Sequence, residues 1–259
     1  KLQNNEAIKY LANLMNGEFN RLLNSNSNME FYEIKFTEKD LAELIQIYKM
    51  KTICVVNYGL GNIKSIFDAF SKFHKKVIVS QTKKDIVSSE VIILPGVGAF
   101  SKGMELLTKL KIISSIEKHV SKNKPFFGVC LGMQMLYDKS EEFGNHKGLS
   151  ILKGEVKKLK YDHNLKLPNI GWRSLTKLRK NSNLLLNNIN EKNEFYFLHS
   201  LYCNPKENST IMAKSNYGKK EFTSVIAKKN IFGCQFHPEK SGENGLRIIK
   251  NFIDTINKD

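Results

Sequence analysis

The stretch Phe126-Phe127-Gly128-Val129-Cys130-Leu131-Gly132 places a cysteine between two glycines, directly after an apolar run. The run predicts a buried strand that ends in a sharp turn into a helix. Glycines two places before and after Cys130 are expected because backbone and helix approach closely at such a turn. The turn projects the sulfur outward, near a helix N-terminus that favours a thiolate. The motif predicts a cysteine nucleophile; a buried cysteine beside ordinary glycines is the alternative.

Upstream of this turn, apolar runs alternate with stretches of helical periodicity. Residues 63–73 and 112–120 carry apolar side chains at helical spacing. Short β-branched or aromatic runs predict buried strands at residues 53–56, 77–79, 91–94 and 126–129. Strands alternating with helices indicate a parallel sheet with right-handed crossovers. We therefore predict an α/β sandwich with a largely parallel central sheet, helices on both faces, and Cys130 at the C-terminal end of a strand.

Two parts of the chain differ in pattern, and the boundary lies near Met50. Before it, residues 7–23 have helical spacing and residues 31–36 alternate as a strand does, but no motif there carries chemistry. After it, the second half is richer in strands and closes with an amphipathic helix. Those later strands are expected at 154–160, 194–198, 224–227 and 231–236, and the helix at 245–256. We therefore predict an N-terminal extension of unknown role, residues 1–49, and a single α/β domain, residues 50–259.

A second motif, Phe236-His237-Pro238-Glu239-Lys240-Ser241, follows an apolar run. His237 and Glu239 are two residues apart, so in an extended segment both side chains leave the same face. A histidine base oriented by a carboxylate activates a cysteine nucleophile. A lone histidine near a strand end is usually structural, but the adjacent carboxylate favours a triad of Cys130, His237 and Glu239.

A third motif, Pro95-Gly96-Val97-Gly98-Ala99-Phe100, ends another apolar strand. Acyl transfer needs backbone N–H groups at the place where the oxyanion develops. A glycine-containing loop at a strand's C-terminal end brings one such group close, and the N–H of Leu131, directly after the nucleophile, supplies another. An ordinary turn from strand to helix is the alternative, because glycines are common at such turns.

Composition limits the classes of partner. Lys and Arg number 41 against 25 Asp and Glu, which gives a formal net charge of +16. The basic residues are mostly scattered lysines, not the clustered arginines of a nucleic-acid interface, so we predict no nucleic-acid partner. The charge suits an acidic partner surface or a phosphorylated ligand. No apolar run approaches the roughly eighteen residues of a membrane helix, and the first residues lack a signal peptide's apolar core, so no membrane partner is predicted.

The cysteines and histidines outside these motifs are expected to be structural. No C-x-x-C pair occurs, so no metal site is predicted, and a reducing cytoplasm suits the free thiols. Cys54 and Cys234 lie in apolar strand patterns and Cys203 lies beside a turn, so all three are expected to pack rather than react. His74 lies in a polar, lysine-rich stretch and is expected to be solvated.

Taken together, the motifs over 128–134, 95–100 and 235–241 resemble those of the class I glutamine amidotransferases, and the resemblance covers residues 50–253. More narrowly, the chain resembles the glutaminase subunits of imidazole glycerol phosphate synthase, from histidine biosynthesis. Three further motifs support the narrower match, namely Asn57-Tyr58-Gly59-Leu60-Gly61-Asn62, Lys147-Gly148-Leu149 and Gly171-Trp172. The resemblance implies a flavodoxin-like sandwich that needs neither a metal nor an organic cofactor.

The resemblance also implies an activity, the hydrolysis of glutamine to glutamate and ammonia. Cys130 attacks the side-chain amide of glutamine, His237 accepts the thiol proton and then protonates the departing ammonia, and Glu239 orients His237. A γ-glutamyl thioester forms and water hydrolyses it. The resemblance further assigns the oxyanion hole to Val97, Gly98 and Leu131, and substrate contacts to Gly96, Gln134 and Ser200.

The implied partner is a (βα)₈-barrel cyclase subunit, which receives the ammonia within a cytoplasmic heterodimer. The residues expected to face this partner are Asn57, Asn62, Trp172 and Lys240. Two motifs depart from the family near these positions. The family usually has Gly-Trp-Asn where this chain has Gly171-Trp172-Arg173, and it tends to have His-Ser-Tyr where this chain has His199-Ser200-Leu201.

These departures and the extension keep one alternative open, a paralogous glutaminase that feeds ammonia to a sugar-amidating synthase of surface-polysaccharide assembly. Two other classes fit less well. A silent binding module does not need the intact triad, and a cysteine peptidase does not account for Gln134 together with the His-Pro-Glu motif.

Overall fold

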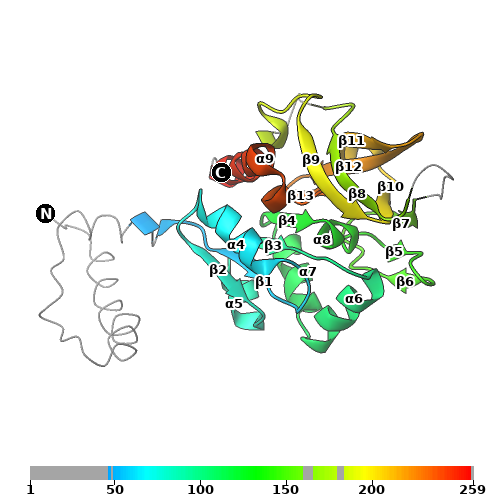
Figure 1. The fold of residues 1–259 in the computed structure, drawn as a ribbon. Coiled ribbons are helices and arrows are strands. Elements are labelled where there is room, and N and C mark those ends of the chain that lie inside the picture. Colours follow the sequence, from blue (N-terminus) through cyan, green and yellow to red (C-terminus); the bar gives the residue numbers. More distant parts are fainter. Residues whose placement is uncertain (1–45, 48, 160–165, 180–183, 258–259) are drawn as a thin grey trace, which may run out of the picture. The chain divides into compact units, whose positions relative to one another are not determined.

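The computed structural model describes residues 46–47, 49–159, 166–179 and 184–257 (Figure 1). The chain divides into two compact units, Lys1–Met50 and Lys51–Asp259. The helix and strand expected at residues 7–23 and 31–36 lie outside the described residues, so the extension predicted for residues 1–49 stays a prediction. All motifs quoted above lie in the second unit.

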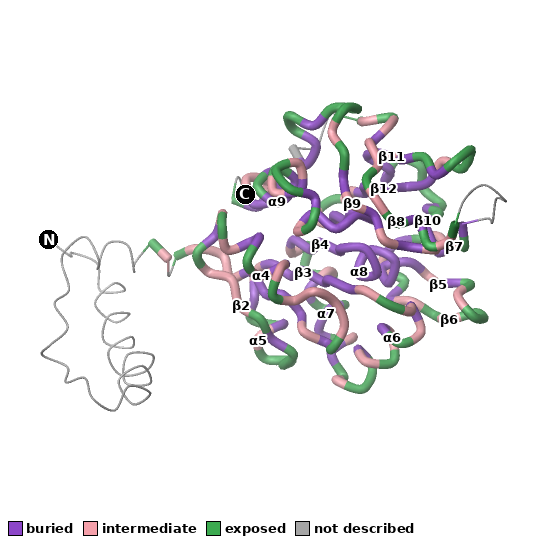
Figure 2. The backbone as a smooth tube through the Cα atoms, viewed as in Figure 1, coloured by how far each residue is buried: buried purple, intermediate pink, exposed green. Residues whose placement is uncertain are grey.

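A seven-stranded sheet forms the centre of the second unit, in the order β11-β12-β13-β4-β3-β1-β2. Five neighbouring strands of this sheet, β2, β1, β3, β4 and β13, run parallel to one another. The remaining two, β12 and β11, extend the sheet beyond β13 in antiparallel fashion. Their bounds are β1 Ile53–Val56, β2 Val77–Ser80, β3 Val91–Leu94, β4 Phe126–Val129, β11 Ile211–Tyr217, β12 Lys220–Lys228 and β13 Ile231–Cys234. The apolar runs therefore form strands where they were predicted, and β1, β3 and β4 are buried along their whole length (Figure 2).

Helices cover both faces of this sheet because successive side chains of a strand point to opposite sides. Ile53 and Val55 of β1 belong to the core that includes α4 and α9, whereas Cys54 and Val56 belong to the core that includes α5, α6 and α7. The helices are α4 Ile63–Ser71, α5 Lys83–Ser88, α6 Phe100–Lys109, α7 Ile113–Ser121, α8 Leu131–Gln134 and α9 Gly242–Ile256. This arrangement confirms the predicted α/β sandwich. No helix in the described ranges is long and apolar enough to cross a bilayer.

Two smaller sheets complete the unit, one in the order β10-β7-β5-β6 and one made of β8 and β9. Their bounds are β5 Lys139–Ser140, β6 His146–Lys147, β7 Gly154–Lys158, β8 Asn169–Ser174, β9 Glu194–His199 and β10 Leu201–Pro205. Short 3₁₀ turns lie at η2 Leu184–Leu186, η3 Asn208–Thr210 and η4 Pro238–Lys240. The sequence patterns did not predict β5, β6, β8, β10, β11, α5 or α6, whose runs are short or mixed in polarity.

The expectation that His74 is solvated is wrong. Its side chain lies in the interior at 2% exposure, and its Nε2 is 2.6 Å from the carbonyl oxygen of Lys51. Burial lowers the pKa of His74, so the ring is neutral at pH 7. The neighbouring Lys75 is exposed, which shows that the polar residues of this stretch face outward while the ring turns inward.

Candidate active site

Cys130 lies at the turn between β4 and α8 in a strained conformation. Its φ of 52° and ψ of −110° fall in a region that residues with a side chain rarely adopt. Such a backbone costs of order 1–3 kcal/mol and persists only where neighbouring contacts enforce it. One such contact is the hydrogen bond from the Cys130 N–H to the carbonyl oxygen of Cys234 at 2.8 Å. It ties this turn from strand to helix, the nucleophile elbow, to β13, the neighbouring strand of the sheet.

The two glycines around Cys130 permit close backbone contacts. A methyl group on Gly132 would lie 1.7 Å from the carbonyl oxygen of Leu94, at the end of β3. A methyl group on Gly128 would lie 2.8 Å from the backbone nitrogen of Met133, at the start of the helix. The spacing G-x-C-x-G therefore has the physical reason expected from the sequence, since both positions face backbone that cannot move aside.

His237 and Glu239 follow β13 and form a buried pair. The Nδ1 of His237 lies 2.9 Å from Oε1 of Glu239, and the two side chains are 2% and 1% exposed. The His237 N–H donates to the carbonyl oxygen of Tyr196 at 2.9 Å, and Ser241 Oγ donates to the His237 carbonyl oxygen at 2.6 Å. The segment is thus fixed to β9 on one side and to its own turn on the other.

The second nitrogen of the His237 ring is directed towards Cys130. The ring interacts with the Glu239 carboxylate through Nδ1, and it also interacts with the side chain of Cys130. Among the described residues no group lies within ordinary hydrogen-bond geometry of this buried Nε2, but Cys130 is near enough to raise the pKa of His237. Hydrogen bonds between catalytic groups are often long before the substrate binds, so the arrangement suits a base that waits beside its nucleophile.

The electrostatic surroundings hold His237 in its charged form. Burial on its own would lower the pKa of His237, but the Cys130 sulfur and the Glu239 carboxylate together raise the pKa to about 10. An imidazolium is the charge state that the base of a cysteine nucleophile adopts when the proton has passed from sulfur to nitrogen.

The Pro95–Phe100 loop packs directly on the elbow. A methyl group on Gly96 would lie 2.8 Å from Cβ of Leu131, and Gly98 has a φ of 116° that favours glycine. Among the described residues, the backbone N–H groups of Val97 and Gly98 have no hydrogen-bond partner. The N–H of Leu131 opens α8, where first-turn donors lack an intrahelical acceptor. The loop that carries Val97 and Gly98 therefore packs against Leu131, the residue directly after the nucleophile.

Two residues without a predicted role hold this loop. The hydroxyl of Tyr58, a residue of the 57–62 motif, donates to the carbonyl oxygen of Pro95 at 2.8 Å and is buried. The carboxylate of Glu142 accepts from the Phe100 N–H at 2.5 Å, at the N-terminus of α6. Tyr58 was recognisable only as part of a motif, and nothing in the local pattern around Glu142 pointed to this contact.

Gln134 and Ser200, both predicted to contact the substrate, lie in different surroundings. Gln134 is buried, and its side-chain nitrogen donates to the carbonyl oxygen of Leu201 at 3.0 Å and to Oε1 of Gln235 at 3.1 Å. Ser200 is half-buried between β9 and β10. The sequence analysis missed Gln235, although residues two apart in an extended segment share a face and Gln235 is two residues before His237.

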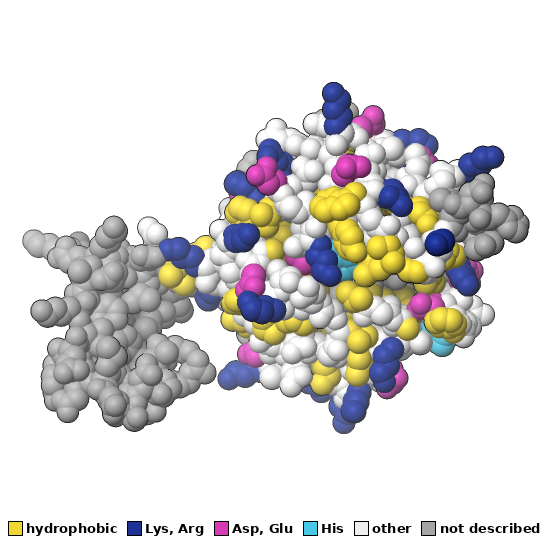
Figure 3. Space-filling model, in the orientation of Figure 1, with side chains coloured by type: hydrophobic (Ala, Val, Ile, Leu, Met, Phe, Trp, Pro, Cys, Tyr) yellow, Lys and Arg dark blue, Asp and Glu magenta, His cyan; other side chains and the backbone are white. Residues whose placement is uncertain are grey.

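Of the four residues predicted to face a partner, two are exposed and two are half-buried. Trp172 is 47% exposed and packs edge-on against Tyr196 with ring centroids 6.0 Å apart, while Lys240 is exposed. Asn57 and Asn62 are half-buried and serve their own turn, since their side chains accept from Gly59 N–H and Ser65 N–H. Figure 3 shows apolar side chains gathered on the face where β8 and β9 lie.

The two departures from the family lie close to this face. Arg173 donates to the carbonyl oxygen of Trp172 at 2.6 Å, and its guanidinium lies 5.3 Å from the ring centroid of Tyr217. Leu201 is buried. Neither side chain contacts Cys130, His237 or Glu239 through a hydrogen bond among the described residues.

The other cysteines are buried thiols, as predicted. Burial raises the pKa of Cys54 to about 11, and it raises the pKa values of Cys203 and Cys234 well above their usual range. None of the three is therefore a thiolate at neutral pH. Within the residues that the structure describes, no cluster of His, Cys, Asp and Glu could hold a metal ion.

Comparison with known proteins gives a consistent match. The family profile described as "Glutamine amidotransferase class-I" matches residues 54–256. The chain is similar to "Imidazole glycerol phosphate synthase subunit HisH 1" of Legionella pneumophila strain Lens, at 40% identity over 79% of this chain and 99% of the relative. It is also similar to the HisH subunit of Caldanaerobacter subterraneus subsp. tengcongensis, at 43% identity over 79% of this chain and 98% of the relative.

Solved structures resemble the fold at low sequence identity. "Structure of PurLQS from Thermotoga maritima" superposes with a TM-score of 0.61 at 20% identity, over 80% of this chain and all 100% of that chain. The glutaminase domain of a Trypanosoma brucei CTPS with bound acivicin superposes with a TM-score of 0.59 at 15% identity, over 81% of this chain and 95% of that chain.

Proposed function

The chain belongs to the class I glutamine amidotransferase family, and from that premise we propose that Cys130, His237 and Glu239 carry out its chemistry. The chain is the glutaminase subunit of imidazole glycerol phosphate synthase, which hydrolyses glutamine to supply ammonia in histidine biosynthesis. The observation that carries the proposed triad is the strained Cys130 elbow beside the buried His237–Glu239 pair at 2.9 Å.

In the first half of the reaction, the Cys130 thiolate attacks the side-chain carbonyl carbon of glutamine. The carbonyl oxygen becomes an oxyanion, and the proton on His237 passes to the leaving nitrogen. The C–N bond breaks, ammonia departs, and a γ-glutamyl thioester remains on Cys130. Because His237 is already held as an imidazolium, it enters this half-reaction as the acid that the leaving amine needs.

In the second half, a water molecule attacks the thioester carbon while neutral His237 takes its proton. The C–S bond breaks, glutamate leaves, and the thiolate–imidazolium pair is restored. Both halves pass through an oxyanion, and the N–H groups of Val97, Gly98 and Leu131 are the donors we assign to it. Gly96, Gln134 and Ser200 are the substrate contacts we assign.

We further propose that ammonia passes to a (βα)₈-barrel cyclase subunit in the cytoplasm. The exposed apolar side chain of Trp172 and the charge of Lys240 suit a protein partner on the face of β8 and β9. Asn57 and Asn62 shape the turn beside the Pro95–Phe100 loop, because a methyl group on Gly61 would lie 3.3 Å from Gly96 N. We also propose that residues 1–49 are an N-terminal extension of unknown role and that residues 50–259 are the amidotransferase domain.

The relatives named above are HisH subunits, which favours the histidine pathway over a sugar-amidating paralogue. Glutamate release from glutamine tests both levels of the proposal. We would measure it with the full chain alone and with the histidine-pathway cyclase subunit plus its nucleotide substrate. Stimulation by the cyclase, together with abolition in Cys130→Ala, is the expected result. Release that depends on Cys130 but ignores the cyclase would reject the partner, and undiminished release by Cys130→Ala would reject the triad.

A further inference from the structure

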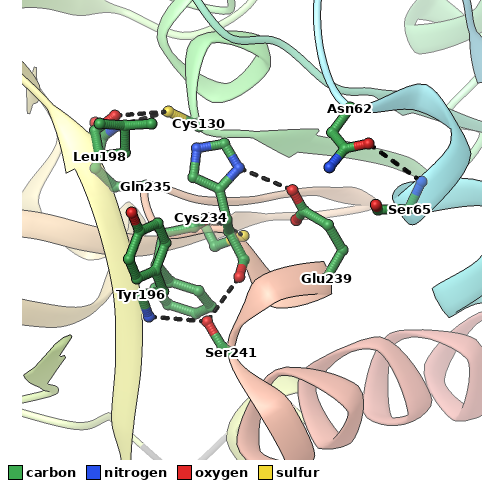
Figure 4. A network of polar contacts seen from close by, with 11 residues as sticks. Asn62, Ser65, Cys130, Tyr196, Leu198, Cys234, Gln235, Glu239 and Ser241 are labelled. Carbon is green, nitrogen blue, oxygen red and sulfur yellow. Dashed lines mark hydrogen bonds and ion pairs between the residues drawn. The ribbon is translucent and has the colours of Figure 1, made fainter. Parts of the chain in front are cut away.

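A fully buried amide contacts the reacting sulfur. Gln235 has no exposed area, and its Nε2 lies 3.6 Å from Sγ of Cys130 (Figure 4). Its Oε1 accepts from the side-chain nitrogen of Gln134 at 3.1 Å, and that nitrogen also donates to the carbonyl oxygen of Leu201 at 3.0 Å. Two amides and one backbone carbonyl thus form a hydrogen-bond series that ends on the sulfur.

The direction of this hydrogen-bond series is set by the backbone. The Leu201 carbonyl oxygen can only accept, so the Gln134 atom that faces it must be the NH₂ group. The second hydrogen of that NH₂ group requires an acceptor, which makes the Gln235 atom beside it the side-chain oxygen. Gln235 must then direct its own NH₂ group at Cys130. Reversing either amide would place two donors or two acceptors against each other inside the protein.

The end of the hydrogen-bond series at Leu201 is equally determined. Leu201 O also accepts from Nδ1 of His199 at 2.7 Å, and the other His199 nitrogen, Nε2, lies 3.0 Å from Nδ2 of Asn169. Burial lowers the pKa of His199 to about 4, so the ring is neutral and carries its proton on Nδ1. The carbonyl oxygen that orients Gln134 is therefore held by a ring that does not change charge near neutral pH.

We propose that Gln235 is a catalytic residue that donates an N–H hydrogen bond to the Cys130 thiolate, and that Gln134 positions it for this task. The proposal rests on the triad assigned above. A hydrogen bond to an anionic sulfur lowers the free energy of the thiolate relative to the thiol. It acts twice in the cycle, because the thiolate is the attacking group in the first half-reaction and the leaving group in the second.

The Leu198 carbonyl oxygen, 3.8 Å from Sγ of Cys130, can only accept, so the donors beside the sulfur are Gln235 and His237. Burial raises the pKa values of Tyr58, Cys203 and Cys234, so these groups stay neutral near pH 7. His237 is charged and is paired with Glu239. His237 loses its proton during the reaction, whereas the amide of Gln235 does not titrate. Gln235 therefore continues to donate to the sulfur when His237 is neutral, as it is while the thioester is hydrolysed.

The pH profile of Cys130 alkylation tests this role without requiring turnover. We would measure the rate of modification by iodoacetamide in the full chain, with Cys130 identified by peptide mass spectrometry. Gln235→Met keeps the length of the side chain and removes the donor. We expect the midpoint of its profile to rise by about one pH unit, so that alkylation below the midpoint slows about tenfold. Gln134→Met should shift the midpoint in the same direction by less.

Gln81→Met is the matched control, because Gln81 is exposed and lies outside the site. Its profile should equal that of the wild type. A wild-type midpoint in folded Gln235→Met, with folding judged by circular dichroism, would overturn the proposal. If Cys130→Ala keeps full glutaminase activity, the triad itself fails; if Cys130→Ala is inactive and Gln235→Met shifts nothing, only the role of Gln235 fails.

A measurement on the unmutated side chain covers the case in which Gln235→Met does not fold. The side-chain amide of Gln235 can be followed by NMR in the ¹⁵N-labelled wild-type chain, assigned with the help of Cys130→Ala. We expect its N–H resonance to titrate with the same midpoint as Cys130 alkylation. A resonance that ignores the ionisation of Cys130 would refute the hydrogen bond.

Discussion

The substitution Gly132→Ala should separate the Pro95–Phe100 loop from the nucleophile elbow. The added methyl group would lie 1.7 Å from Leu94 O and 2.7 Å from Leu94 C, whereas real Cβ atoms essentially never approach within 3.0 Å. The end of β3 and the elbow must therefore move apart by at least the difference between 3.0 and 1.7 Å, which is 1.3 Å. Both contacting groups are backbone, so no side chain can turn aside to accommodate the methyl group.

The magnitude follows from the displacement. Overpacking of this kind typically costs about 1–3 kcal/mol of unfolding free energy. A misplacement of about 1 Å between catalytic groups can cost about a hundredfold in rate. We therefore expect Gly132→Ala to lower kcat/KM for glutaminase by about a hundredfold, and to lose about 1–3 kcal/mol in urea unfolding.

Gly103→Ala is the matched control for this experiment. It adds the same methyl group in α6, where the nearest atom is the Sδ of Met135 at 2.8 Å, on a flexible side chain. An added alanine in a helix offsets part of any strain by about 1 kcal/mol. Its stability and activity should stay near those of the wild type. If Gly132→Ala matches the wild type in both, the account of the elbow as backbone packed on backbone is refuted.

Three further predictions address charge, the loop and local structure. The folded pKa of His237, about 10, exceeds its ordinary value of 6.5, so its contribution to stability is complete below about pH 6.5 and is lost as the pH rises through about 10. Urea unfolding across this range should show that loss at lower pH in Cys130→Ala, and an unchanged profile would contradict the coupling between sulfur and imidazole. Tyr58→Phe leaves the buried Pro95 carbonyl oxygen without its donor, so unfolding free energy should fall by about 1–3 kcal/mol and the glutaminase rate should fall with it. Wild-type values of both would show that the hydroxyl does not hold the loop. Thr82→Ala removes the N-cap of α5 and should cost about 1 kcal/mol in thermal or urea unfolding without changing glutaminase kinetics. A loss of activity there would connect α5 to the site in a way that the contacts do not.

Sequence alone sufficed where the decisive geometry is local. The strands β1, β3 and β4 were predictable because apolar β-branched and aromatic runs bury both faces of a parallel sheet. The elbow was predictable because the glycines flanking Cys130 reflect the turn itself. His237 and Glu239 were predictable as a pair because residues two apart in an extended segment share a face, which is a property of the backbone and not of the fold.

Only the tertiary structure could decide which distant segments meet at the sulfur. Gln235 and Cys130 are 105 residues apart, and Gln134 and Gln235 are 101 apart, so their contacts depend on β13 lying beside β4 in the sheet. The same holds for the hydroxyl of Tyr58, which reaches the loop after β3 because β1 and β3 are neighbours. The burial of His74 also escaped the sequence, since its lysine-rich neighbours described the surface of the segment and not the side of it that packs. Periodicity and spacing specify what one segment does with its own backbone, whereas the pairing of strands specifies which side chains share a site.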